Sequence, residues 1–163
     1  MIKNPKLKKF VSIVSVAPLL YLAGIAVSLF LYFVMPWPLV GMRAESVLLG
    51  VGMGLIVLAT LLVFWAQGIS RKGAHRPTVI SAGPVCEDFM RGPYKYMRHP
   101  GALGLMIMFA GFVLVVNSLV MAVLLVLFVI AETVWFVPAE EAEYMESCPE
   151  AYGEYRRRVR MWI

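Results

Sequence analysis

The sequence predicts an all-α, polytopic membrane protein with four transmembrane helices, and three observations support this fold class. Of the 163 residues, 61% are apolar and only 15% are charged, which is more apolar than an ordinary soluble domain. Four apolar runs occur at about 11–35, 46–67, 101–116 and 118–137, and about 20 apolar residues are needed to cross a bilayer as a helix. The basic residues gather at the ends of these runs, as membrane topology requires.

The first and third runs need separate justification. The first follows a lysine-rich segment that resembles a signal peptide, but it is too long and has no small-residue cleavage site, so we interpret it as a retained span. Pro18 is placed to kink this helix, and Pro36 with Pro38 ends it. The third run is short for a full crossing, and only Asn117 and Ser118 separate it from the fourth, which predicts a tight helical hairpin.

The distribution of charge predicts the orientation. All Lys and Arg residues except Arg43 lie before the first run, between the second and third runs, or after the fourth. Cytoplasmic loops hold the excess of basic residues, so both termini and the polar loop 68–100 are expected in the cytoplasm. Acids precede bases in the C-terminal segment 138–163, which predicts an interfacial amphipathic helix. No linker or repeat divides the chain, so residues 1–163 are expected to form one integral membrane domain.

Several classes of partner are not expected. The basic residues form no stripe interleaved with aromatic side chains, so a nucleic-acid partner is not predicted, nor is a metal site. The two cysteines, Cys86 and Cys148, fall in predicted cytoplasmic segments and are expected to be reduced thiols. Gly50, Gly52 and Gly54 in the second span permit close packing within the monomer or between chains. A monomer is the default expectation.

The polar loop ends in a motif that carries chemistry. Gly92-Pro93 is a turn signal, and Pro100 is placed at the first turn of the helix that follows. Arg98 and His99 therefore meet a helix N-terminus, where unpaired backbone donors and a guanidinium favour a carboxylate or phosphate. The alternative is structural, with Arg98 and Lys95 as interfacial anchors and His99 as a helix cap.

Acidic residues supply the second polar group. Glu140 and Glu141 lie where the fourth span leaves the membrane, level with the Arg98 region. Other acids of the C-terminal segment are explained by pairing on a solvated surface, namely Glu143, Glu146, Glu150 and Glu154. Glu132 lies inside the predicted fourth span, where a lone acid costs a few kcal/mol. It is either a substrate-pocket residue or a structural hydrogen-bonding group.

Residues 68–163 resemble the membrane methyltransferases typified by isoprenylcysteine carboxyl methyltransferase and the phospholipid N-methyltransferases. That family carries the pattern G-x-Y-x-x-x-R-H-P-x-Y-x-G, which is reproduced by Gly92, Tyr94, Arg98, His99, Pro100 and Gly104. It also carries paired glutamates followed by a tyrosine after the last span, which is matched by Glu140, Glu141 and Tyr152. The two motifs occur in order and flank the predicted hairpin.

The resemblance implies a pocket for S-adenosylmethionine that opens sideways toward lipid, so that a lipophilic acceptor enters from the bilayer. Arg98 and His99 would hold the methionyl carboxylate, and Glu140 or Glu141 the ammonium or ribose. The remaining cofactor-binding residues implied are Tyr94, Pro100, Gly104, Tyr152 and Tyr155, with the tyrosines lining or closing the pocket.

The acceptor stays open at this point. The family tyrosine two residues after the proline is Ala102 here, and the Phe-Gly of the second motif is Cys148-Pro149. The prenylcysteine enzymes usually carry an arginine a few residues before the paired glutamates, and the corresponding stretch Trp135-Phe136-Val137-Pro138 has none. A carboxylate or thiolate acceptor needs no base, whereas an ammonium must lose a proton, with His99, Glu132 or Glu140 as candidate bases.

Two alternative functions remain open. Membrane steroid 5α-reductases, which use NAD(P)H, have a similar helical layout and a related His-Pro motif. Their pattern continues with Asn and Glu, where this chain has Gly101 and Leu105. A non-enzymatic scaffold or lipid-binding protein would need only an interfacial ion pair.

Overall fold

The computed structural model describes residues 22–34, 37–39, 41, 45–73 and 89–163. Pro18, Pro36, Arg43 and Cys86 lie outside the described residues, as does the part of the polar loop from 74 to 88. Throughout the described part the chain is helical, and its single β feature is an isolated antiparallel bridge between Pro38 and Ser118. The all-α prediction is confirmed for these residues.

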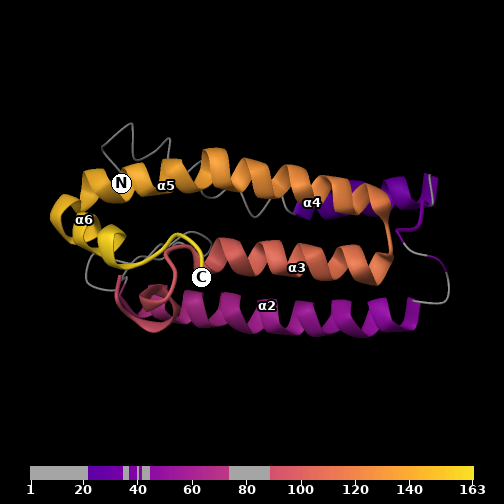
Figure 1. The fold of residues 1–163 in the computed structure, drawn as a ribbon, viewed down its shortest axis with the longest axis horizontal. Coiled ribbons are helices and arrows are strands. Elements are labelled where there is room, and N and C mark those ends of the chain that lie inside the picture. The colour runs from indigo at the N-terminus through magenta and orange to yellow at the C-terminus, as the bar shows by residue number, and fades with distance from the viewer. Residues whose placement is uncertain (1–21, 35–36, 40, 42–44, 74–88) are drawn as a thin grey trace.

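The helices form a long, narrow arrangement in which α2, α3 and the α4–α5 rod run side by side (Figure 1). In chain order the elements are the helix Leu22–Val34, α2 (Glu45–Gly73), a 3₁₀ turn (Gly92–Lys95), α3 (Pro100–Val116), α4 (Leu119–Ala131), a π-helical segment (Glu132–Phe136), α5 (Val137–Ser147) and α6 (Pro149–Arg158). The α4 helix, the π-helical segment and α5 follow one another without a break.

Within the described residues two helices are long and apolar enough to cross a membrane, Glu45–Ile69 and Leu119–Glu146. The helices Leu22–Val34 and Pro100–Val116 are apolar but shorter. Large apolar side chains such as Leu61 and Phe64 point away from the protein on α2. Lipid is the solvent in which such a surface is stable.

The α2 and α3 helices approach closely because glycines face each other across them. A Cβ atom on Gly52 would lie 2.7 Å from the backbone oxygen of Gly111, and one on Gly111 would lie 2.8 Å from that of Gly52. Small residues let helix backbones come this near in a membrane. Gly50 and Gly54 face open space, so Gly52 is the glycine of this group that serves packing within the monomer.

The connection between α3 and α4 is held by the loop that follows the first described helix. Asn117 ends α3 with φ 52° and ψ 47°, and the Ser118 hydroxyl accepts a hydrogen bond from the Met121 amide. The Leu39 amide donates to the Asn117 carbonyl at 3.1 Å, and the Leu119 amide donates to the Trp37 carbonyl at 3.0 Å. These backbone hydrogen bonds lie at the end of the helices opposite α6 (Figure 1).

The C-terminal segment differs from its prediction. The fourth helical rod continues to Ser147 instead of ending near residue 137, and the chain then turns at Cys148 into α6. The segment predicted to hold one amphipathic helix therefore contains the end of the fourth rod and the separate helix α6. Cys148 is disulfide-bonded, so the expectation of a reduced thiol is also wrong. That expectation used only the predicted compartment and took no account of which residues the fold brings together.

Candidate functional site

Both polar motifs lie at one end of the helices, where α3 begins and α5 turns into α6 (Figure 1). The residues of the first motif reach this place through a 3₁₀ turn. Gly92 has φ +54°, and a Cβ atom there would lie 2.6 Å from Ile69 Cγ1 of α2, so only glycine fits. The turn is closed by backbone bonds from Tyr94 to Arg91 at 3.1 Å and from Met97 to Pro93 at 3.2 Å.

The turn delivers Arg98 and His99 to the start of α3, inside the protein. His99 is the N-cap residue of α3, and Pro100 is in its first turn. The His99 side chain makes no capping hydrogen bond to the helix. Arg98 is only 9% exposed, so it is no interfacial anchor either. His99 therefore caps α3 by its backbone position, and the side chains of both residues point elsewhere than to a cap or an interface.

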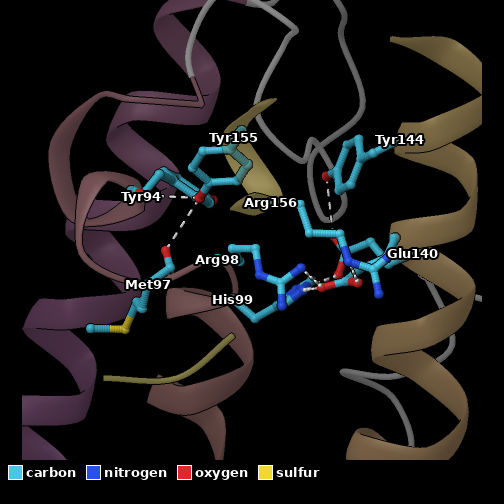
Figure 2. Close-up of polar contacts among 9 residues, drawn as sticks. Tyr94, Met97, Arg98, His99, Glu140, Tyr144, Tyr155 and Arg156 are labelled. Carbon is cyan, nitrogen blue, oxygen red and sulfur yellow. Dashed lines mark hydrogen bonds and ion pairs between the residues drawn. The ribbon is translucent and has the colours of Figure 1, made fainter. Parts of the chain in front are cut away.

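Arg98 and His99 meet the paired glutamates of α5. Arg98 Nη1 lies 2.7 Å from Glu141 Oε1. The His99 ring bridges the two acids, with Nδ1 3.2 Å from Glu140 Oε2 and Nε2 3.1 Å from Glu141 Oε1. Figure 2 shows these groups pointing toward one another from α3 and α5. The fold thus joins the two sequence motifs into one cluster.

Two more side chains complete the cluster. The Tyr144 hydroxyl donates to Glu140 Oε1 at 3.1 Å, one turn further along α5, and Arg156 Nε of α6 lies 3.4 Å from Glu141 Oε2 (Figure 2). Neither residue was predicted as part of the site. Tyr144 lies four residues after Glu140, and this spacing places both on one face of a helix, so the sequence could have indicated Tyr144. The position of Arg156 depends instead on the turn between α5 and α6.

The charged side chains of the cluster are buried, so their stability depends on their pairing. The His99 and Glu141 side chains are 4% and 6% exposed, and buried charges are stable only when paired and hydrogen-bonded. Burial alone would lower the pKa of His99, but the hydrogen bonds and charges of Glu140 and Glu141 raise it to about 9. His99 is therefore protonated at neutral pH. With Arg98 and Arg156 opposing the two glutamates, the cluster carries one net positive charge.

Arg98 keeps donors to spare. Among the described residues its Nε has no hydrogen-bond partner, and Nη1, although close to Glu141, is not aligned to donate to it. A buried guanidinium with unused donors is costly in a finished core. The guanidinium therefore has donors that a further acceptor can use, and a carboxylate matches a guanidinium best.

A family model described as phospholipid methyltransferase matches residues 47–154, which spans α2 through most of α6. The chain belongs to the phospholipid methyltransferase family. No curated protein and no solved structure matches it. The match includes Arg98, His99, Glu140 and Glu141, so the cluster lies within the part of the chain that defines a membrane methyltransferase. Arg156 lies beyond the matched residues.

The tyrosines predicted for the pocket of the methyltransferase surround the cluster. The Tyr155 hydroxyl donates to the Tyr94 carbonyl at 2.7 Å and ties α6 to the 3₁₀ turn (Figure 2). Tyr152 and Tyr155 pack with Phe89, whose ring stacks on Tyr155 at 5.1 Å. Burial raises the pKa of Tyr152 and of Tyr155, so both hydroxyls are neutral. These contacts hold the site together, and a role in cofactor binding stays a prediction.

Pro100 and Gly104 have positions that their structural surroundings explain. Pro100 is fully buried at the start of α3, where a missing N–H costs nothing. Gly104 faces α2, and a Cβ atom there would lie 2.5 Å from Val63 Cγ2. The residue permits close contact between α3 and α2 of the methyltransferase. Its assignment to cofactor binding stays a prediction.

The C-terminal residues join the site in a way that the sequence did not predict. The Arg98 amide donates to the Arg160 carbonyl at 3.0 Å, and the Trp162 ring lies 6.1 Å from the His99 ring. Trp162 lies near the C-terminus, outside both sequence motifs. Its contact with His99 follows from a backbone pairing that no local pattern encodes.

Glu132, the third predicted catalytic residue, lies deeper along the same rod. Its side chain is 7% exposed, and it interacts electrostatically with His99 and Glu140. The structure thus brings Glu132 within electrostatic reach of His99, another of the predicted catalytic residues.

Proposed function

We propose that this member of the phospholipid methyltransferase family catalyses S-adenosylmethionine-dependent methyl transfer to a lipophilic acceptor that reaches the site from the bilayer. The observation that carries the proposal is the cluster of Arg98, His99, Glu140 and Glu141, which joins the two motifs of a membrane methyltransferase. A bound S-adenosylmethionine supplies a methyl group made electrophilic by its sulfonium.

The residues present fit the methionyl part of this cofactor. A zwitterion carries a carboxylate and an ammonium, and the cluster holds guanidinium and imidazolium groups beside two carboxylates. Arg98 and His99 would hold the carboxylate, since Arg98 has unused donors. Glu140 or Glu141 would hold the ammonium or a ribose hydroxyl, and Tyr94, Tyr152 and Tyr155 would line the pocket.

Binding on these residues is an exchange of partners. In this cluster Arg98, His99 and Arg156 each already contact a glutamate. An incoming carboxylate and ammonium would therefore replace contacts of the same kind. The total charge compensation inside the site is preserved, which avoids an unpaired buried charge. The chain's own task is then to orient the reactants and exclude water, which supplies most of the rate enhancement for such a transfer.

The membrane arrangement belongs to the same proposal. The α2 helix and the α4–α5 rod would cross the bilayer, with Leu22–Val34 and Pro100–Val116 as shorter helices of a four-span bundle whose third and fourth spans form a hairpin. The distribution of basic residues supports cytoplasmic termini and a cytoplasmic site. Family membership favours this function over a reductase or a scaffold.

Calorimetry of the purified protein with S-adenosylhomocysteine tests the proposal. Arg98→Ala and Glu141→Ala are each expected to weaken binding about 10- to 100-fold, the effect of one lost charge-assisted hydrogen bond. Arg98→Lys keeps the charge but lacks the planar guanidinium, so its affinity is expected to be intermediate. Arg157→Ala, at an exposed position of α6, is the matched control and should bind as the wild type does.

Two results would overturn the proposal. One is absence of S-adenosylhomocysteine binding by the folded wild-type protein. The other is binding that Arg98→Ala and Glu141→Ala leave unchanged. The same titration with NADPH tests the reductase, for which binding of NADPH in place of S-adenosylhomocysteine is the diagnostic outcome.

A further inference from the structure

Both carboxylate oxygens of Glu140 are engaged inside the protein. Oε2 lies 3.2 Å from Nδ1 of the His99 ring, and Oε1 accepts a hydrogen bond from the Tyr144 hydroxyl at 3.1 Å. The His99 side chain is 4% exposed, and Tyr144 lies one turn further along the same helix as Glu140. A ligand that takes over either oxygen must leave a group of the protein interior without its partner, which is costly.

Glu141 has one oxygen of a different kind. Its Oε1 contacts Arg98 at 2.7 Å and His99 at 3.1 Å, and both of these side chains are almost fully buried. Its Oε2 contacts Nε of Arg156, which reaches the cluster from α6, at 3.4 Å (Figure 2). The Arg156 side chain is 53% exposed. Among the described residues, Glu141 Oε2 is therefore the carboxylate oxygen of the cluster whose partner is most open to solvent.

The contact with Arg156 is the weakest of the three ion pairs on Glu141. It is the longest of them, and of the three cations Arg156 acts least on the charge of Glu141. An ion pair with an exposed arginine is worth little, because water solvates the guanidinium when the pair breaks. Arg98 and His99 have no such alternative in the protein interior. Arg156 is thus the partner that Glu141 loses at the lowest cost.

We propose that Arg156 is a placeholder cation, which pairs with Glu141 Oε2 in the empty site and is displaced by the ammonium group of the methionyl moiety. This inference rests on the proposed function and narrows the ammonium subsite from the two glutamates to Glu141. It also adds a residue that the family match does not include, since that match ends at residue 154. In the exchange the guanidinium of Arg156 turns to solvent, and no covalent bond changes.

The exchange keeps the charge of the site balanced. With His99 protonated, the three cations of the cluster exceed its two glutamates by one charge. When Arg156 leaves, Arg98 and His99 balance Glu140 and Glu141, and the zwitterionic methionyl group adds no net charge. The positive charge that Arg156 withdraws equals the one that a sulfonium brings.

The placeholder role has a consequence for affinity. Because Arg156 and the ligand ammonium compete for the same oxygen, Arg156 lowers the affinity of the site for ligands that carry an ammonium group. Ligands without that group leave the pair between Arg156 and Glu141 intact, so they gain nothing from its removal. The residue therefore acts on one functional group of the ligand, which a general stabilising contact does not.

Calorimetry of the full chain in detergent tests the competition with two probes, S-adenosylhomocysteine and its analogue with hydrogen in place of the amino group. Arg156→Gln is expected to bind S-adenosylhomocysteine about two- to fivefold more tightly than the wild type, the range that an exposed ion pair is worth. The analogue should gain no affinity. Arg156→Lys keeps a competing cation and should bind close to the wild type. Arg157→Gln, at the next exposed position of α6, is the matched control and should bind S-adenosylhomocysteine as the wild type does.

A purely structural role for Arg156 predicts the opposite direction. If the pair with Glu141 served only to hold α6 against α5, Arg156→Gln would unfold at a lower temperature and would bind both probes more weakly. Unchanged or weaker binding of S-adenosylhomocysteine by Arg156→Gln, equal tightening of both probes, or loss of the folded state would overturn the placeholder role and leave the proposed function intact. Failure of the wild type to bind S-adenosylhomocysteine would instead reject the proposed function.

Discussion

Arg98 Nη1 and Glu141 Oε1 lie 2.7 Å apart and are almost fully buried, although one residue precedes α3 and the other lies on α5. The pair locks the start of one helix to the middle of another. His99 joins the same Glu141 oxygen at 3.1 Å. The stability of this end of the protein and its chemistry therefore depend on the same few atoms.

Breaking this pair should destabilise the protein strongly. Arg98→Ala leaves a buried carboxylate with fewer partners, and Glu141→Ala leaves buried cations, so each is expected to cost about 3–5 kcal/mol. The double variant Arg98→Ala/Glu141→Ala should cost less than the sum of the two. Thermal unfolding in detergent measures all three, and strict additivity would contradict the pairing.

The raised pKa of His99 predicts that the stability of the protein falls as the pH rises. Its pKa is raised from 6.5 to about 9 in the folded protein, so the stabilisation is fully present below about pH 6.5 and is lost as pH rises through about 9. The His99→Gln variant should lack this loss. Unfolding temperatures of both proteins between pH 6 and 10 give the comparison, and parallel curves would refute the assignment.

The glycine contact between α2 and α3 predicts a difference between two neighbouring positions. Gly52→Ala places a Cβ atom against the Gly111 backbone, which cannot move easily, and should cost about 1–3 kcal/mol. Gly50→Ala meets open space and should be neutral or slightly stabilising, because alanine favours helix. Unfolding temperatures that fall equally for both variants would contradict the close approach.

Tyr155→Phe tests the bond that ties α6 to the 3₁₀ turn. The variant removes the hydroxyl that bonds to the Tyr94 carbonyl at 2.7 Å and should cost about 1–3 kcal/mol, because a buried acceptor loses its partner. Tyr96→Phe is the control, since Tyr96 is 58% exposed. Equal stability of the two variants would show that the hydroxyl bond does not hold α6.

Trp162 should report the charge of His99. A protonated imidazole quenches a neighbouring indole by accepting an electron, and the two rings lie 6.1 Å apart. In a variant with Trp37, Trp65 and Trp135 replaced by Phe, Trp162 emission is expected to rise as pH passes about 9. Adding His99→Gln should abolish the transition, and its persistence would place its origin elsewhere.

The sequence predicted the helical class and four members of the cluster, because helices and short motifs are local properties. Arg98 and His99 are neighbours in the chain, as are Glu140 and Glu141. The resemblance of both motifs to one family indicated that the two pairs belong to one site. The π-helical segment was missed because it is a slip in hydrogen-bond register, for which Pro138 is the only local sign. The Arg98 to Arg160 backbone bond and the turn at Cys148 were missed because they arise from tertiary packing.

The backbone bonds that join Leu39 to Asn117 and Leu119 to Trp37 fasten the helices at the end away from the site. At the site, by contrast, α3 and α5 are joined through side chains of Arg98, His99 and the two glutamates. The α3 helix and the α4–α5 rod are therefore hinged at the α3–α4 connection. Any parting of α3 from α5 to admit a reactant must pivot there, so a small rotation at this connection produces its widest opening among the ion pairs.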